Sequence, residues 1–245
     1  AARHLHARAA RPNLLIKIPG TPEGIPAIEQ SIADGIPINI TLLFSRAHYL
    51  AAAAATMRGI ERRLAAGKDP AVASVASIFV SRWDAAVTDR VPAALRNRLG
   101  IAVAMRIYKA HLDLLASTRW QRLAAAGALP PRLLWASTGS KDPAVADLLY
   151  VEALVAPDTI DTLPEATLLA CADHGRADHG LPADAGYAEA VLAEFLSLGI
   201  DDEVLAAELQ GQGVAAFARS WGELLDHIGA KGAGAHVGAA DGGGV

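Results

Sequence analysis

Five short apolar runs, each ended by turn residues, constrain the fold of this chain more than any other feature. They cover residues 14–18, 38–44, 75–81, 132–137 and 151–156. Apolar runs of this length predict strands that are buried on both faces. Between the first two runs, Thr21 and Pro22 begin a predicted helix that Gly35 ends. Strand, helix and strand in succession predict a βαβ unit and hence parallel strands.

The segments between the runs predict helices. Their ranges are 1–10, 22–35, 46–66, 84–98, 101–126 and 184–228, the last broken near residues 199–201 and 211–213. Parallel strands that alternate with helices fit either a closed (β/α)8 TIM barrel or an open doubly wound sheet. No glycine-rich dinucleotide motif follows any run, which favours the barrel. We therefore expect an α/β domain over residues 1–228, followed by a disordered, glycine- and alanine-rich tail at 229–245.

The composition favours one large domain and argues against several kinds of partner. The 245 residues carry a formal net charge of −4 and are 52% apolar, enough for a core but without the excess of basic residues that nucleic-acid binding requires. No apolar stretch reaches the roughly 18 residues needed to span a membrane, and we expect no secretion signal. The single cysteine, Cys171, is typical of a reducing compartment. We expect a cytoplasmic protein that binds neither nucleic acid nor membrane.

Lys17 lies inside the first apolar run, which ends at a Pro-Gly-Thr turn. An ammonium in a strand buried on both faces loses hydration, which lowers its pKa. A neutral lysine amine is a nucleophile that forms Schiff bases with carbonyl compounds. The alternative is a lysine whose stem packs inside while its head reaches water. The octapeptide at residues 14–21 does not decide between these two interpretations.

Polar side chains in the next two runs suggest a polar site. In a strand over residues 38–44, alternation places Asn39, Thr41 and Leu43 on one face. Two polar groups on one face of an apolar strand indicate a polar interior site or, alternatively, a hydrogen-bonded pair in a core. Ser77 lies within the third run and Arg82 where that run ends. An arginine at that place is either part of the site or a surface ion-pair partner.

The turn from Ser137 to Lys141 follows the fourth run and combines exposed amides with a cation. Such a turn at the carboxyl end of a parallel strand suits phosphate, although an ordinary helix-capping turn has the same composition. Two Asp-His-Gly triplets, at 173–175 and 178–180, invite a metal interpretation. They lie in a glycine-rich loop with no further ligand cluster, so we expect no metal.

Four segments resemble those of transaldolases. They are residues 16–24, 38–45, 77–82 and 134–139, and the similarity continues to about residue 228. The resemblance implies a TIM barrel in which the Lys17 strand is the fourth. The chain would then hold the last five βα units with extra C-terminal helices, and three units of about 120 residues in all would precede Ala1.

The resemblance also implies roles for individual residues. Lys17 matches the Schiff-base lysine, and Asn39 and Ser77 match residues that hydrogen-bond the bound dihydroxyacetone unit. Thr41 matches a residue that helps to hold a catalytic water.

Phosphate ligands are implied at the other end of the substrate. Arg82 and Ser137 match such ligands. The family often has an arginine two residues after that serine, where this chain has Gly139, and Lys141 is the nearest cation. Lys141 is therefore a candidate phosphate ligand.

The implied function is the transfer of a three-carbon unit between sugar phosphates in the pentose phosphate pathway, without metal or organic cofactor. The resemblance places the proton-transfer aspartate and the water-positioning glutamate on strands upstream of Ala1, so we expect these residues alone to be nearly inactive. The alternatives are a fructose 6-phosphate aldolase-like enzyme and a non-catalytic sugar-phosphate-binding fragment. The insertion at 84–130 and the helical extension at 184–228 favour transaldolase.

Overall fold

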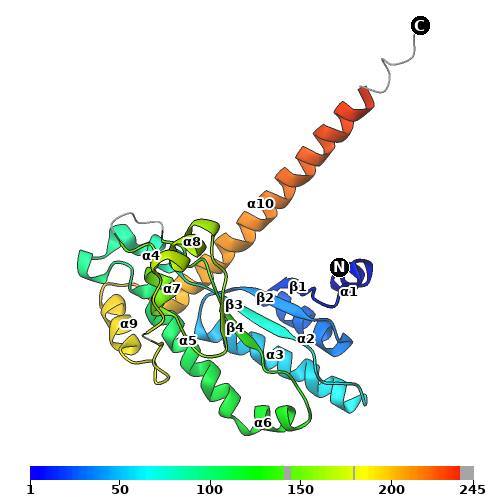
Figure 1. Ribbon diagram of the computed structural model, residues 1–245, viewed down its shortest axis with the longest axis horizontal. Helices are drawn as coiled ribbons and strands as arrows, with labels where there is room; N and C mark the ends of the chain where they lie inside the picture. Colours follow the sequence, from blue (N-terminus) through cyan, green and yellow to red (C-terminus); the bar gives the residue numbers. More distant parts are fainter. Residues whose placement is uncertain (141–144, 179, 238–245) are drawn as a thin grey trace.

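The described part of the chain forms one parallel sheet surrounded by helices (Figure 1). The computed structural model describes residues 1–140, 145–178 and 180–237, with side chains described as far as Lys231. Five strands follow in sequence order across the sheet, all parallel: β1 Ile16–Pro19, β2 Ile38–Leu43, β3 Ser74–Phe79, β4 Arg132–Ala136 and β5 Thr159–Asp161. This arrangement is consistent with a TIM-barrel-like fold.

Helices connect the strands and extend the chain beyond them. They are α1 Ala2–Ala9, α2 Gly24–Asp34, α3 Arg46–Ala65, α4 Ser81–Val87, α5 Leu99–Ala116, α6 Thr118–Ala125, α7 Leu149–Ala153, α8 Glu165–His174, α9 Ala188–Ser197 and α10 Asp202–Val237, with 3-10 turns at Thr88–Arg90 and Ala93–Leu95. Helix α10 leaves the body as a long arm (Figure 1). None of the described helices combines the length and apolar character that a membrane crossing requires.

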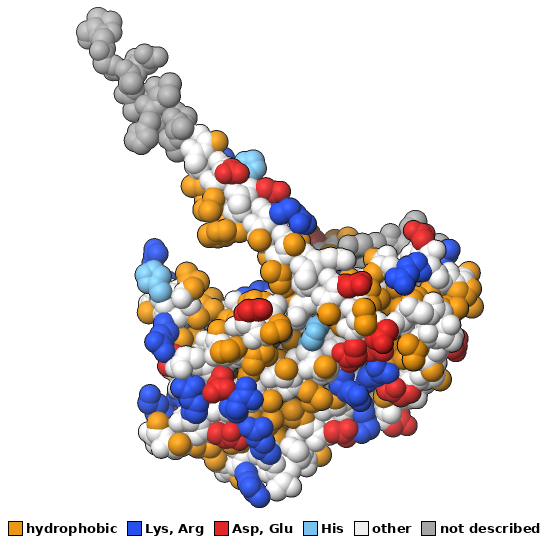
Figure 2. Space-filling model, turned by 180° about the vertical axis from the view of Figure 1, so that it is seen from behind, with side chains coloured by type: hydrophobic (Ala, Val, Ile, Leu, Met, Phe, Trp, Pro, Cys, Tyr) orange, Lys and Arg blue, Asp and Glu red, His pale blue; other side chains and the backbone are white. Residues whose placement is uncertain are grey.

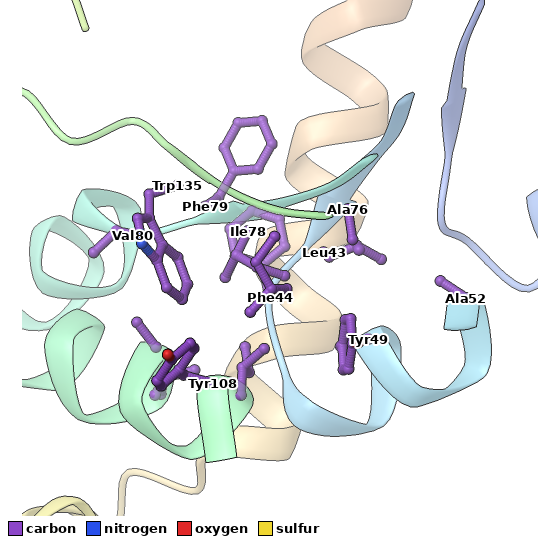
Figure 3. Close-up of a cluster of buried hydrophobic side chains, with 14 of the residues drawn as sticks. Leu43, Phe44, Tyr49, Ala52, Ala76, Ile78, Phe79, Val80, Tyr108 and Trp135 are labelled. Carbon is purple, nitrogen blue, oxygen red and sulfur yellow. The ribbon is translucent and has the colours of Figure 1, made fainter. Parts of the chain in front are cut away.

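The core lies between the sheet and helices α2, α3 and α5. Figure 3 shows the centre of this core, where β2 and β3 direct Leu43, Ala76 and Ile78 toward the helices. Phe44 follows β2 and packs its ring against Phe79, with the two centroids 5.4 Å apart. Because Leu43, Ala76 and Ile78 are almost fully buried, the helix-facing side of the sheet is fixed by apolar packing.

The predicted end of α2 at Gly35 and the predicted cap of α3 at Ser45 are confirmed, whereas α2 begins at Gly24 and not at the predicted first helical position, Pro22. The Thr21 hydroxyl accepts a hydrogen bond from the Gly24 nitrogen at 3.2 Å, and Gly35 ends α2 in the left-handed conformation at φ 83°. The Ser45 hydroxyl accepts from the His48 nitrogen at 3.2 Å and caps α3. These local signals act through their own backbone neighbours, which is why the sequence alone identifies them.

A β-bulge interrupts the alternation expected in β2. Ile40 pairs with Ala76, but the next paired residue is Leu43, opposite Ile78, and Leu42 has a positive φ of 59°. Leu43 therefore faces the helices together with Ile78, rather than sharing a face with Asn39 as the simple alternation predicted. The extra residue of a bulge turns the following side chains to the other face.

The fifth predicted strand is wrong. Residues 151–156 overlap helix α7, and the strand β5 follows Pro157 instead of preceding it. Tyr150 and Leu154 are both buried at helical spacing, so one helical face is anchored in the core. The apolar run was short enough to fit a helix segment as well as a strand.

Two predicted helices are also different in the structure. The segment 84–98 is helical only in α4 and two 3-10 turns, because Pro92 is extended and Asn97 has a φ of 61°. The pattern at 101–126 divides into α5 and α6 at Ser117, whose hydroxyl accepts from the Trp120 nitrogen at 3.2 Å.

The C-terminal region follows the prediction in part. The break near residues 199–201 is confirmed, since α9 ends at Ser197 and α10 begins at Asp202. The break at 211–213 is wrong, because α10 continues through both glycines. Helix α10 also continues to Val237, inside the range predicted to be a tail, and residues 238–245 lie outside the described part.

Candidate active site

The candidate site lies on the face of the sheet opposite α2 and α3. Lys17 is paired in register with Asn39, and Pro19 is paired with Thr41. In a parallel sheet, side chains of paired residues point to the same face. The sheet thus brings Lys17, Asn39 and Thr41, three of the predicted site residues, together on one face.

Lys17 itself is exposed, which corrects the expectation of a strand buried on both faces. Along β1, Ile16 and Ile18 are buried whereas Lys17 and Pro19 are exposed. β1 is an edge strand with its isoleucines against the helices, and its other face is open. The structure therefore matches the alternative in which the lysine head reaches water. Its nitrogen Nζ lies 5.8 Å from the ring centroid of Phe217, in α10.

A pocket of about 280 Å³ opens beside the lysine. Its described lining consists of Lys17, Pro19, Thr41, Leu42, Val214 and Phe217. Thr41 is 4% exposed, and among the described residues its Oγ1 has no hydrogen-bond partner. A buried hydroxyl without a protein partner is ready to bind a polar ligand group or water. The pocket thus places one amine and one free hydroxyl against an apolar wall.

Asn39 and Ser77 form a direct contact on the same face. The Ser77 hydroxyl donates to Asn39 Oδ1 at 2.7 Å, so the two residues predicted to bind one substrate unit do lie together. Asn39 is half-buried and Ser77 is 3% exposed. Because Ser77 occupies the oxygen of the amide, the Asn39 NH2 group is directed elsewhere and can donate to a ligand.

Arg82 and Ser137 are brought together through Ser81. The Ser81 and Ser137 hydroxyl oxygens lie 2.9 Å apart, and the Ser81 nitrogen donates to the Ser137 carbonyl at 2.9 Å. Arg82 stacks on Phe79, with its guanidinium carbon 4.8 Å from the ring centroid, and the described residues offer it no ion pair. A half-buried arginine without a carboxylate partner is suited to bind an anion. Lys141 lies outside the described residues.

Asp84 connects this end of the sheet to two further helices, a role that the sequence did not reveal. Its carboxylate accepts from the nitrogens of Leu99 and Gly100, at 2.9 and 3.1 Å, and from the Tyr150 hydroxyl at 3.0 Å. Burial raises the pKa of Asp84 to about 6 despite these hydrogen bonds. The network ties α4, which begins with Ser81 and Arg82, to α5 and α7.

A second, half-buried carboxylate lies beside the turn after β4. Asp161 accepts from the Thr138 hydroxyl at 2.8 Å, and burial raises its pKa to about 6. This contact fixes the start of the turn predicted to bind phosphate.

The two Asp-His-Gly triplets do not converge on a metal site in the described residues. His174 lies 3.2 Å from a carboxylate oxygen of Asp147 and of Asp173, and His179 is outside the described part. Within the described ranges, no group of three His, Cys, Asp or Glu side chains is placed to hold a metal ion.

The sequence did not identify Phe217 and Val214 as pocket residues. Both lie in α10, which is far from Lys17 in sequence. A signal was present, because Val214, Phe217 and Trp221 recur at helical spacing and are all exposed. Which side chains of this stripe lie near the lysine becomes clear only from the packing of α10 across the end of β2.

Comparison with known proteins shows the family of the chain. The sequence pattern of the family described as Transaldolase/Fructose-6-phosphate aldolase matches residues 1–228. Relatives named transaldolase from Parafrankia sp., Neisseria gonorrhoeae and Thermobifida fusca are 48%, 47% and 45% identical over 93%, 91% and 93% of this chain. The chain spans 64% of the length of each of these three relatives. The chain belongs to the transaldolase/fructose-6-phosphate aldolase family.

Proposed function

We propose that this chain is the Lys17-bearing part of a transaldolase, which transfers a dihydroxyacetone unit from a ketose phosphate to an aldose phosphate. The observation that supports this best is the shared face of Lys17, Thr41 and the Asn39–Ser77 pair. One nucleophilic amine beside several neutral hydrogen-bonding groups suits a polyhydroxy ketone. Arg82 supplies a cation for the phosphate.

The chemistry begins with the neutral amine of Lys17. Its nitrogen attacks C2 of sedoheptulose 7-phosphate or fructose 6-phosphate, and loss of water gives a protonated imine. The C3–C4 bond then breaks as a base removes the C4 hydroxyl proton. The bond electrons move into the iminium and form an enamine, and the aldose phosphate leaves. C3 of the enamine next attacks the aldehyde carbon of the acceptor, and water releases the new ketose.

The neighbouring residues have distinct roles in this scheme. Asn39 and Ser77 hydrogen-bond the hydroxyls of the dihydroxyacetone unit, and the free Thr41 hydroxyl holds the water that is lost and added. Arg82 and Ser137 bind the phosphate at the far end of the substrate, with Lys141 as a further candidate. No metal or organic cofactor is required, because the iminium accepts the developing charge.

The described residues of the pocket supply no general acid or base for proton transfer. The described pocket lining includes no carboxylate. A missing general acid or base costs about 10² to 10⁴ in rate. We therefore expect imine formation with Lys17 to be much easier to detect than turnover.

The proposal extends to architecture and location. The five parallel strands fit the last five βα units of a TIM barrel, and the open face of Lys17 then corresponds to the barrel interior. A cytoplasmic location is supported by the single free cysteine, Cys171, which suits a reducing compartment.

The proposed function is tested by following the labelled three-carbon unit from donor to product. Fructose 6-phosphate labelled at C1 to C3 is incubated for a long period with the chain and erythrose 4-phosphate, and the labelled products are separated. Transaldolase activity places the label in a seven-carbon ketose phosphate. Label in free dihydroxyacetone, whether or not the acceptor is present, would instead indicate a fructose 6-phosphate aldolase-like enzyme. Label that stays in fructose 6-phosphate, together with no borohydride-trapped adduct on Lys17, would favour a non-catalytic binding role.

A further inference from the structure

Helix α10 packs Leu205, Ala206 and Leu209 into the core, and the buried amide of Gln210 then hydrogen-bonds the helix to the sheet. Gln210 is 7% exposed, and its Nε2 donates to the carbonyl oxygens of Leu42 at 2.9 Å and Gly20 at 3.2 Å. Gly20 directly follows β1, which carries Lys17, and Leu42 directly follows Thr41. A buried amide keeps such bonds because a buried polar group left unpaired is destabilising. Gln210 therefore fixes α10 against both strands of the candidate site.

The attachment coincides with the β-bulge. Leu42 has a positive φ of 59°, a conformation that is costly for a leucine. Its carbonyl is one of the two that Gln210 binds. A Cβ at Gly213 would lie 2.7 Å from Leu42 Cδ2, so glycine is what allows the helix this close to the bulge. Helix α10 and the bulge thus support each other at one point.

One stretch of α10 beyond this point lies beside the lysine. Val214 and Phe217 line the pocket, and the Phe217 ring centroid is 5.8 Å from Lys17 Nζ. Figure 2 shows hydrophobic side chains gathered along the arm as it leaves the body. The position of Phe217 is therefore determined by where the helix is anchored, since nothing described beyond the pocket holds the arm.

We infer that Gln210 is a positioning residue for the Lys17 site, acting by anchoring α10 so that the Phe217 ring lies beside the lysine amine. This inference rests on the proposed function for its role in sugar chemistry. A fixed ring beside Nζ limits the directions from which the amine meets a carbonyl. The face of an aromatic ring also attracts a cation, which the protonated imine is.

The test compares Gln210→Met with Gln212→Met. Methionine is similar in size to glutamine but has no donor, and Gln212 is an exposed glutamine of the same helix. Gly213→Ala is a second variant that displaces α10 without removing the Gln210 amide. Circular dichroism checks that each variant is folded. The first measurement is the rate at which acetic anhydride acetylates Lys17, with Lys68 and Lys109 as internal references in the same mass spectrum.

We expect Gln210→Met and Gly213→Ala to raise the acetylation rate of Lys17 at least threefold, with Lys68 and Lys109 unchanged and Gln212→Met like the wild type. Adding Phe217→Ala to Gln210→Met should cause no further rise in the acetylation rate of Lys17, because the Phe217 ring is already displaced in Gln210→Met. Equal Lys17 acetylation in Gln210→Met and Gln212→Met would overturn the inference.

A second measurement separates this inference from the proposed function. Borohydride traps the imine with fructose 6-phosphate, and in Gln210→Met we expect the maximal trapping rate to fall at least tenfold while the half-saturating sugar concentration changes less than twofold. Such a split is not what general destabilisation produces. If the wild type yields no adduct while Lys17 acetylation responds as expected, the proposed function fails and the anchoring role of Gln210 stands. A wild-type adduct with trapping unaffected in Gln210→Met would overturn the positioning role.

Discussion

The Ser77 hydroxyl donates a 2.7 Å hydrogen bond to Asn39 Oδ1, linking β3 to β2 on the same face as Lys17. This bond determines how the Asn39 amide can serve a substrate. Because the bond orients the amide with its oxygen toward Ser77, the Asn39 NH2 group is directed elsewhere and can donate to hydroxyl or alkoxide oxygens of a sugar.

Ser77→Ala should free the Asn39 amide to rotate. We expect the half-saturating concentration of fructose 6-phosphate in borohydride trapping to rise roughly fivefold, which corresponds to about 1 kcal/mol for one lost hydrogen bond. Ser74→Ala is the matched control, because Ser74 lies on the same strand, faces the helices, and has no hydrogen-bond partner among the described residues. Equal effects of the two substitutions would argue against a role of the Asn39–Ser77 bond in sugar binding.

Arg82→Met should weaken the binding of phosphorylated ketoses only. A lost charge-assisted bond is worth about 2 kcal/mol, so the half-saturating concentration of fructose 6-phosphate should rise roughly 30-fold. Trapping of dihydroxyacetone, which lacks a phosphate, should stay within twofold of the wild type. Arg90→Met, at an exposed position after α4, is the control. A parallel loss with both ketoses would show that Arg82 acts on structure and not on phosphate.

Asp84 should make the protein less stable as the pH rises from about 4 to 6. Its pKa is raised from 3.8 to about 6 by burial, so between these values the folded state binds more protons than the unfolded state. Stability is therefore greatest below pH 4 for this group, and about 3 kcal/mol is lost through this window. Asp161 has a raised pKa for the same reason and contributes in the same window.

Asp84→Asn should remove the share of this slope that belongs to Asp84. Urea unfolding at several pH values between 4 and 7 measures it, with the exposed Asp89→Asn as control. The free energy of unfolding of Asp84→Asn should fall less steeply with pH than that of the wild type. Identical slopes for wild type and Asp84→Asn would contradict the assignment.

The sequence predicted those parts of the fold and site that depend on local signals or on strand order. The helix end at Gly35 and the cap at Ser45 act on their own backbone neighbours, and the parallel pairing of β1 with β2 follows from a βαβ unit with short connections. The apolar run at 151–156 was predicted to be a strand but overlaps α7. That helix is held by a contact distant in sequence, the hydrogen bond from the Tyr150 hydroxyl to Asp84. Local patterns do not contain such contacts.

The exposure of Lys17 could not be predicted for a related reason. Whether the second face of a strand is covered depends on what packs over it, and here the described cover is a side chain from α10. The β-bulge at Leu42 could not be predicted either, since the hydrogen bond to its carbonyl comes from Gln210 in that same helix. Both cases involve α10, whose place on the sheet is set by tertiary contacts alone.

The proposed chemistry requires the amine of Lys17 to form an imine with a ketose phosphate on the open face of the sheet. Peptide mapping of the chain after incubation with fructose 6-phosphate and borohydride, beside Lys17→Arg, measures this step. We expect one reduced sugar adduct, on the peptide that contains Lys17, and none in Lys17→Arg. No adduct on the wild type, or an adduct on another lysine that persists in Lys17→Arg, would contradict it.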